Sequence, residues 1–281
     1  HLNLHPIIAG NFMLDGGAMF GVVPKSIWQK TNPADNNNMV KIAARCLLVE
    51  DGEKLVLIDT GMGNKQSEKF FSYYHRWGQE TLESSLKKCG FSPDDITDVF
   101  LTHLHFDHCG GGVIRSAEGL YKTAFKNAKY WSNKAHWEWA SSPNKREIAS
   151  FLKENFVPVE KSGQLSFLKK DEENYLTRCS LGFDVLFVDG HTEKQMIPII
   201  TYKGQKIAFA ADLVPTAGHV PLAYIPGYDI RPLTSLREKE SFLSFCDDNN
   251  VLLFFEHDAF EELGLVHQTE RGIRLKSTLK L

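Results

Sequence analysis

Residues 102–112 hold three imidazoles and one carboxylate within six positions, at His103, His105, Asp107 and His108. Neutral histidine nitrogens and carboxylate oxygens are the donors that zinc and similar divalent metals bind. Several such groups are costly to bring together without an ion to hold them. The residue types and their spacing therefore predict a metal site.

The segment before this run, residues 98–101, is expected to form a short buried strand. Side chains two residues apart share one face of a strand. We therefore expect His103, His105 and Asp107 to project the same way as the strand runs out, with the following glycines allowing a tight turn. Cys109 is expected to be a small packing residue rather than a ligand, because free cysteine is usually buried.

Three more apolar segments each end next to a residue that could bind a metal. His191 follows the segment 183–188, Asp212 follows 206–210, and His257 follows 251–255. Taken alone, either histidine could be a buried structural residue, and the aspartate could be a helix N-cap. Because active sites in layered α/β folds gather at strand ends, we expect all three to join the cluster.

Composition narrows the class of protein. The chain has 281 residues, a net charge of −3 and 42% hydrophobic residues. It shows no basic surface for nucleic acid, no apolar run that would span a membrane and no signal peptide. Five cysteines without a CxxC pair fit a reducing, cytoplasmic compartment. Since the chain begins at His1 rather than at a methionine, the question of whether an N-terminal segment was removed stays open.

Strand patterns occur both as hairpins and between helices, which predicts a mixed α/β layer fold. The expected elements are a hairpin at 39–49 and 55–59, helices at 80–88, 133–139, 145–156 and 235–247, and a second hairpin at 196–202 and 206–210. No linker or short repeat interrupts them. We therefore expect a single domain over residues 1–281.

This pattern resembles the metallo-β-lactamase superfamily. The motif at residues 103–108 and the later His191, Asp212 and His257 match its dinuclear ligand pattern in order and spacing, and residues 57–61 match its upstream aspartate motif. The resemblance implies an α/β (α+β) fold, a four-layer αββα sandwich of mixed sheets with the site at one edge of two facing sheets.

The same resemblance implies a role for each ligand. One ion would be held by His103, His105 and His191, the other by Asp107, His108 and His257, and Asp212 would bridge them. Asp59 would orient a ligand histidine through its free ring nitrogen. Zinc is the first choice for this donor set, and manganese, iron and cobalt also fit it.

Residues 14–25 and 212–216 resemble the N-acyl homoserine lactonase branch of the superfamily. This implies a small lactone or related ester as substrate. A hydroxide that bridges the two ions would attack the carbonyl, and Asp107 or Asp212 could protonate the leaving alkoxide. Glyoxalase-II-type thioesterases share these ligands, organophosphate hydrolases are related, and β-lactamases generally lack the bridging aspartate. A non-catalytic metal-binding protein is the alternative from another class.

Other residues are weaker candidates. Six could contact substrate, although packing within the fold is an equal or simpler explanation: Met19, Phe20, Phe106, His219, Tyr224 and Tyr228. Five histidines without sequence partners are expected at the surface: His1, His5, His75, His136 and His267. The resemblance also makes a homodimer possible, with the segment through Lys25 as a candidate contact.

Overall fold

The computed structural model describes residues 2–281, so the expectation for His1 falls outside it. The chain divides into two compact units. Unit 1 comprises residues 2–11 and 44–175, and unit 2 comprises residues 12–43 and 176–281. The expectation of a single domain stays a prediction.

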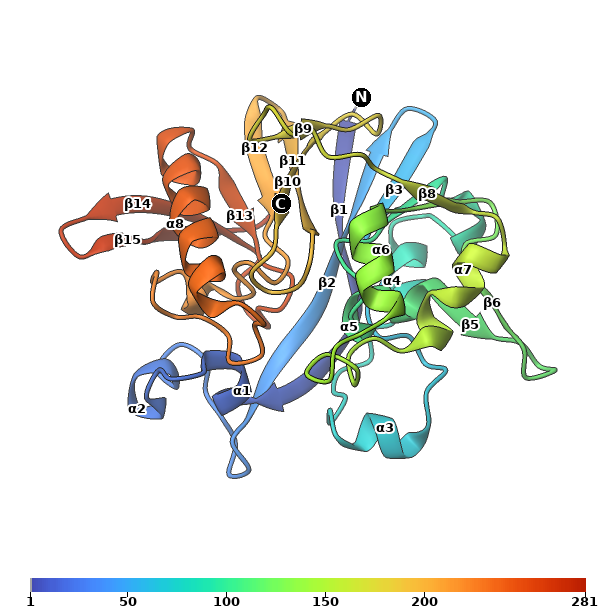
Figure 1. Ribbon diagram of the computed structural model, residues 1–281, viewed down its shortest axis with the longest axis horizontal. Coiled ribbons are helices and arrows are strands. Elements are labelled where there is room, and N and C mark those ends of the chain that lie inside the picture. The colour runs from blue at the N-terminus through green and yellow to red at the C-terminus, as the bar shows by residue number, and fades with distance from the viewer. Residues whose placement is uncertain (1) are drawn as a thin grey trace. The chain divides into compact units, whose positions relative to one another are not determined.

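Unit 1 is built on a six-stranded mixed sheet with the strand order β1-β2-β3-β4-β7-β8, whose first two strands also continue into unit 2. The strands are β1 (Leu2–Asp15), β2 (Met39–Asp51), β3 (Lys54–Ile58), β4 (Asp98–Phe100), β7 (Lys129–Ser132) and β8 (Leu165–Phe167). β2 and β3 form the antiparallel hairpin expected from the sequence, and β3, β4, β7 and β8 run parallel. The hairpin can be followed in Figure 1.

Short helices and a small hairpin accompany this sheet. They are α3 (Glu68–Ser72), α4 (Leu82–Lys88), α5 (Phe106–Cys109), α6 (Lys134–Ser141) and α7 (Val157–Lys161), the 3-10 turns η1 (Pro93–Asp95), η2 (Gly110–Gly112) and η3 (Lys153–Asn155), and the strands β5 (Val113–Arg115) and β6 (Tyr121–Thr123). The helix predicted over 145–156 is wrong: only residues 153–155 are helical there. The Asn144 side chain accepts hydrogen bonds from the Arg146 and Glu147 amides, as a helix N-cap does. The backbone bonds that follow, from Ile148 to Asn144 and from Phe151 to Glu147, close only turns.

The core of unit 1 supports the loop with the histidine cluster. Leu57, Val99 and Leu101 are fully buried in one apolar cluster with Tyr130. The Tyr130 hydroxyl donates to the Gly112 carbonyl at 2.7 Å, so the buried aromatic ring also anchors the glycine turn. The strand ends beneath the cluster are therefore held by packing and by a buried hydrogen bond.

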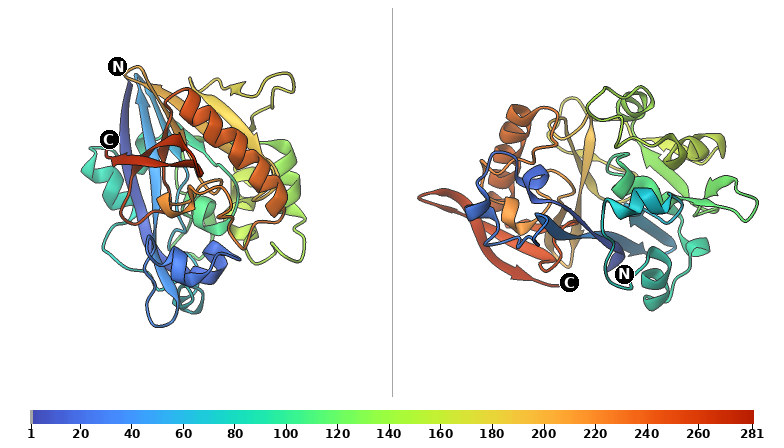
Figure 2. Two further views of the ribbon diagram at one scale, coloured as in Figure 1. Left: turned by 90° about the vertical axis from the view of Figure 1, so that its left-hand side faces the viewer. Right: turned by 90° about the horizontal axis from the view of Figure 1, so that it is seen from below.

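Unit 2 contains a seven-stranded sheet with the order β15-β14-β13-β12-β11-β10-β9. The strands are β9 (Thr177–Arg178), β10 (Asp184–Val188), β11 (Gln195–Tyr202), β12 (Gln205–Phe209), β13 (Leu252–Phe254), β14 (Leu263–Thr269) and β15 (Gly272–Leu279). Only β12 and β13 pair in parallel, and the connection between them contains the 17-residue helix α8 (Pro232–Asp248). Figures 1 and 2 show α8 as the long helix next to the β14–β15 hairpin.

The remaining helices of unit 2 are short: α1 (Gly16–Phe20), α2 (Lys25–Trp28) and the 3-10 turn η4 (Ala217–His219). Among the helices formed by residues 2–281, none has the length and apolar character needed to cross a bilayer. All five cysteines are free thiols, as expected.

Candidate metal centre

The histidine cluster of unit 1 lies on a turn and not on an extended strand. β4 ends at Phe100, and α5 begins at Phe106, with His105 as its N-cap. The expected strand alternation through Asp107 is therefore wrong, because the chain coils before it reaches that residue. The turn still brings the imidazoles together: the ring centroid of His103 lies 4.6 Å from that of His105 and 4.0 Å from that of His108.

The glycines after the cluster are required by close contact with a neighbouring loop. A Cβ atom on Gly111 would lie 2.1 Å from the Thr60 carbonyl oxygen, and one on Gly110 would lie 2.3 Å from the Met62 carbonyl oxygen. The same loop donates to the cluster, since the backbone and side chain of Thr60 both bond to the His108 carbonyl, at 2.8 and 2.9 Å. The two loops are thus locked together by contacts that a larger residue would prevent.

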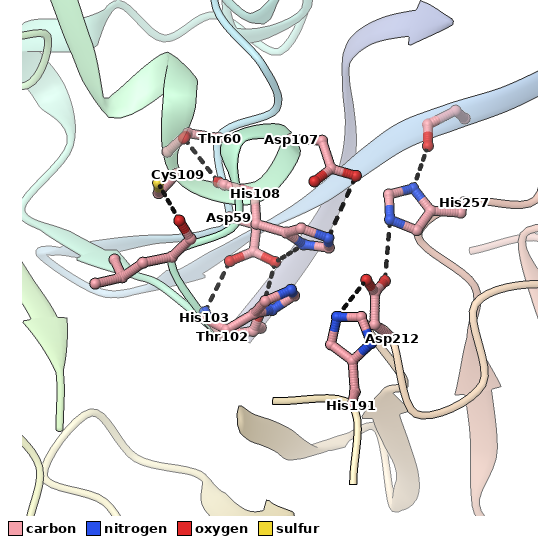
Figure 3. Close-up of polar contacts among 12 residues, drawn as sticks. Asp59, Thr60, Thr102, His103, Asp107, His108, Cys109, His191, Asp212 and His257 are labelled. Atoms are coloured by element: carbon pink, nitrogen blue, oxygen red, sulfur yellow. Dashed lines mark hydrogen bonds and ion pairs between the residues drawn. The ribbon is translucent and has the colours of Figure 1, made fainter. Parts of the chain in front are cut away.

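Asp59 connects two of the candidate ligands, as Figure 3 shows. Its carboxylate accepts from the Thr102 amide at 2.8 Å, from the Thr102 hydroxyl at 2.7 Å and from His108 Nδ1 at 2.9 Å. The Thr102 hydroxyl in turn lies 3.0 Å from His103 Nδ1. These bonds place the ring protons on Nδ1 and leave Nε2 of His103 and His108 for a metal. Asp59 itself adopts a left-handed backbone, with φ at 60°.

Glu147 orients His105 in the same way, and no local sequence pattern predicts this role. His105 Nε2 donates to Glu147 Oε1 at 3.2 Å, which leaves Nδ1 available to a metal. The other oxygen of Glu147 accepts from Trp139 Nε1 at 2.8 Å and from Asn144 Nδ2 at 2.7 Å. The carboxylate is therefore fixed on both sides.

Two neighbours of the cluster are structural. Cys109 is fully buried, its thiol donates to the Leu104 carbonyl, and burial raises its pKa to about 12, which agrees with a packing residue. His136 was expected at the surface, but that prediction is wrong: it is buried and its Nε2 accepts from the Leu104 amide at 2.8 Å. His136 lies on the face of the short helix α6 that points into the protein.

In unit 2, Asp212 turns one oxygen to each of two histidines. Its Oδ2 lies 3.0 Å from His191 Nε2, and its Oδ1 lies 3.0 Å from His257 Nε2, both seen in Figure 3. The Asp212 amide donates to Gln195 Oε1 at 2.9 Å, and the preceding Ala211 has a left-handed φ of 43°. The turn after β12 therefore aims this carboxylate by an unusual backbone conformation.

The second ring nitrogens of these histidines are also used. His191 Nδ1 lies 2.8 Å from Asp229 Oδ1, and Ser235 donates to the other oxygen of Asp229 at 2.6 Å. His257 Nδ1 donates to the Ala43 carbonyl at 2.7 Å. Burial lowers the pKa of His191, but the carboxylates of Asp212 and Asp229 outweigh it and raise the pKa to about 10.

Helix α8 holds the loop that contains His191. Glu238 accepts from the amides of Asp189 and Gly190, at 2.7 and 2.9 Å. A Cβ on Gly190 would lie 2.3 Å from the Ser235 amide nitrogen, so the loop and the helix touch where only glycine fits. Ser235 thus supports this ligand both by contact and through Asp229.

Three of the candidate substrate residues pack against one another within unit 2. Met19, Phe20 and His219 are fully buried, and the rings of Phe20 and His219 stack 4.2 Å apart. His219 Nε2 donates to the Met19 carbonyl at 2.8 Å, and its Nδ1 accepts from the Thr216 hydroxyl at 2.7 Å. Burial lowers the pKa of His219 to about 3. Packing accounts for all three side chains, and a substrate contact through them stays a prediction.

Of the other three candidates, Phe106 is buried and the two tyrosines are half-buried. In unit 1, Phe106 has its ring 4.9 Å from that of Tyr74. In unit 2, the half-buried Tyr228 has its ring 5.6 Å from that of His191, and Tyr224 is half-buried four residues earlier. Their substrate contacts also stay predictions.

Comparison with known proteins bears directly on these clusters. The model of the metallo-beta-lactamase superfamily matches residues 42–257. The chain belongs to this superfamily. Its mixed sheets and helices agree with the α+β metallo-β-lactamase fold expected from the sequence, which is confirmed.

Characterised relatives include N-acyl homoserine lactonases. One from Bacillus cereus is 27% identical over 243 residues, which cover 81% of this chain and 86% of the relative. Another, AttM from Rhizobium radiobacter, is 22% identical over 176 residues and 62% of each chain. The chain thus resembles the lactonase branch.

Solved structures give the same fold. A probable metal-dependent hydrolase from Staphylococcus aureus has a TM-score of 0.88 and 26% identity, over 100% of this chain and 97% of that one. AidC, a dizinc quorum-quenching lactonase, has a TM-score of 0.79 and 22% identity, over 100% and 96% of the two chains. Together with the superfamily match, these relatives support a metal-dependent hydrolase.

The residues fit divalent metal ions. In each candidate histidine, one ring nitrogen contacts a carboxylate, a hydroxyl or a carbonyl that orients the ring. The other ring nitrogen is not used in that contact. Such partners fix the tautomer and raise the basicity of a ligand. Neutral imidazoles beside carboxylates are the donors that zinc, manganese, iron and cobalt accept.

Proposed function

We propose that this protein is a dinuclear metal-dependent hydrolase that opens lactones, with N-acyl homoserine lactones as the first candidate substrates. The observation that carries the proposal is the position of Asp212, with one oxygen 3.0 Å from His191 and the other 3.0 Å from His257. A carboxylate shared between two histidines in this way is suited to bridge two ions, each held by one of them. The lactonase relatives support the choice of substrate.

The proposed ligands are those that the superfamily pattern implies. One ion would be held by His103, His105 and His191, and the other by Asp107, His108 and His257, with Asp212 between them. Zinc is the first choice. When bound, the ions would lower the pKa of a water molecule and polarise the substrate carbonyl.

The chain's own residues then do two things. Asp59, Glu147 and Asp229 each contact one ring nitrogen of a histidine and so fix its orientation. The carboxylate of Asp107 or Asp212 takes a proton from the attacking water and delivers it to the ring oxygen. Water oxygen bonds to the carbonyl carbon, the ring C–O bond breaks, and the ring oxygen takes the proton, which gives the open hydroxy acid.

A substrate panel tests this proposal. Metal-loaded protein is offered an N-acyl homoserine lactone, a glutathione thioester, an aryl phosphotriester and a β-lactam. We expect lactone opening that stops on chelation and returns when metal is added. If lactones stayed intact while another class of substrate was cleaved, the lactonase proposal would be overturned and the hydrolase proposal would remain. No turnover on any substrate, with metal bound, would favour the non-catalytic alternative.

Two further predictions belong to the same proposal. The free cysteines are consistent with a cytoplasmic location. A homodimer that uses the segment through Lys25 stays a prediction, which sedimentation or light scattering of the purified chain would test.

A further inference from the structure

We propose that Glu256 is an additional metal ligand, and that it makes one of the two metal positions rich in oxygen donors. This inference rests on the proposed dinuclear centre. The ligand pattern that the chain shares with its superfamily accounts for His257 but not for the residue before it. The evidence lies entirely within unit 2.

The backbone around Glu256 is fixed from both sides. β13 ends at Phe254, after which the Phe255 amide donates to the Glu262 carbonyl at 2.9 Å. The His257 amide donates to the Pro215 carbonyl at 3.1 Å. Glu256 is therefore held between two anchored neighbours, and it is fully buried.

The carboxylate of Glu256 lies within ligating reach of two residues already in the proposed site. One of its oxygens and the ligand atoms of Asp212 and His257 all lie within 4.8 Å of one another. Two donors that share one ion at about 2.1 Å each are at most about 4.2 Å apart. The triad therefore lies close to the spacing that a shared ion requires.

The charges in this cluster also favour a cation. Buried carboxylates are paired with an opposite charge or coordinate a metal. Asp212 and Glu256 are both buried, at 5% and 0% exposure. A divalent ion between them removes the repulsion and replaces the lost hydration, and His257 adds a neutral nitrogen donor.

A Glu256 ligand would make the two metal positions chemically different. The first would have three imidazoles and the bridging carboxylate. The second would have two imidazoles and up to three carboxylates, those of Asp107, Asp212 and Glu256. Nitrogen-rich donor sets suit zinc, whereas carboxylate-rich sets suit manganese better. We therefore infer that the second position accepts manganese more readily than the first.

The test compares Glu256→Gln with Glu262→Gln. Glutamine keeps the shape of the side chain and removes its charge, and Glu262 is a half-buried glutamate six residues further on in the same unit. Purified proteins are stripped and dialysed against manganese, zinc or both, and bound metal is measured by elemental analysis, with free manganese followed by electron paramagnetic resonance. We expect wild type and Glu262→Gln to hold two ions.

In Glu256→Gln we expect at least a tenfold weaker affinity for manganese, with one zinc retained. The metal-free variant should melt no lower than wild type, because glutamine keeps the size and shape of the side chain, but its gain in Tm on adding manganese should shrink. Glu256→Asp, which keeps the charge on a shorter arm, should bind manganese with intermediate affinity.

Unchanged manganese affinity in Glu256→Gln would overturn the ligand role and leave the dinuclear centre standing. A metal-free variant that melts well below wild type and loses both ions would show that Glu256 is structural, which also overturns the proposal. Wild-type protein that binds fewer than two ions would instead contradict the proposed function itself.

Discussion

The candidate ligands are distinguished from ordinary buried histidines by what their second ring nitrogens contact. Sequence pattern was enough to propose the candidate ligands, because metal-binding residue types at strand ends are rare by chance. It could not find Glu147 or Asp229, which lie 42 and 38 positions from the histidines they contact. Such partners are brought in by folding and have no local signal.

Asp59→Asn tests this support most simply. Asparagine tolerates the left-handed backbone at this position, but its amide group presents a donor where the Thr102 hydroxyl and His108 Nδ1 both donate. We expect metal affinity to fall by about 10- to 100-fold with the fold retained. Competition with a fluorescent chelator measures it.

The matched control for this change is Asp94→Asn, an exposed aspartate of the same unit that pairs with Lys126. It should bind metal as the wild type does. If Asp59→Asn also kept wild-type affinity, Asp59 would not be orienting a ligand.

His219 should make the protein sensitive to acid. Its pKa in the folded chain is about 3, against an ordinary value of 6.5, so between these values the unfolded chain takes up a proton that the folded chain refuses. Stability present above pH 6.5 is therefore lost as the pH falls towards 3, by about 1.4 kcal/mol per pH unit.

Urea unfolding of wild type and His219→Gln from pH 7 to pH 4 measures this effect. The variant should be less stable at pH 7, because it loses the stacking on Phe20, but its stability should fall less steeply with acid. Two parallel curves would show that His219 is not kept neutral by folding.

At the scale of elements, sequence pattern located those with strong periodicity or clear ends. The hairpin of β2 and β3, the helix α8 and the strands before Asp212 and His257 were expected close to their observed bounds. β1 was missed because Pro6 and Gly10 interrupt its pattern, and the half-exposed β15 lacks an apolar face. Elements fixed mainly by tertiary pairing leave little trace in local sequence.

The glycine turn after the histidine cluster should not tolerate a side chain. In Gly111→Ala the new Cβ would meet the Thr60 carbonyl oxygen at 2.1 Å, so the two loops must separate. We expect a loss of about 2 kcal/mol in the free energy of unfolding, together with weaker metal binding.

Gly52→Ala is the comparison, because Gly52 also has a left-handed φ, of 62°, but faces open space. It should cost only about 1 kcal/mol, the strain of the backbone, and leave metal binding unchanged. Equal losses in the two variants, measured by denaturant unfolding, would rule out the close contact as the cause.

At the scale of the whole molecule, the superfamily and its fold followed from a few ligand positions. The motif at residues 103–108, with three later residues in the expected order, was specific enough to identify a superfamily that the match over residues 42–257 then showed. Substrate preference is different, since the candidate contacts, such as Phe106 and Tyr228, have surroundings that only the folded chain defines.

Metal titration of the stripped protein is the most direct test of a dinuclear lactonase. Zinc is added in steps, and bound metal and the opening of an N-acyl homoserine lactone are followed in the same samples. We expect binding to saturate at two ions per chain and lactone opening to reach its plateau only with the second. Full activity at one ion per chain, or two bound ions without lactone opening, would contradict the proposed function.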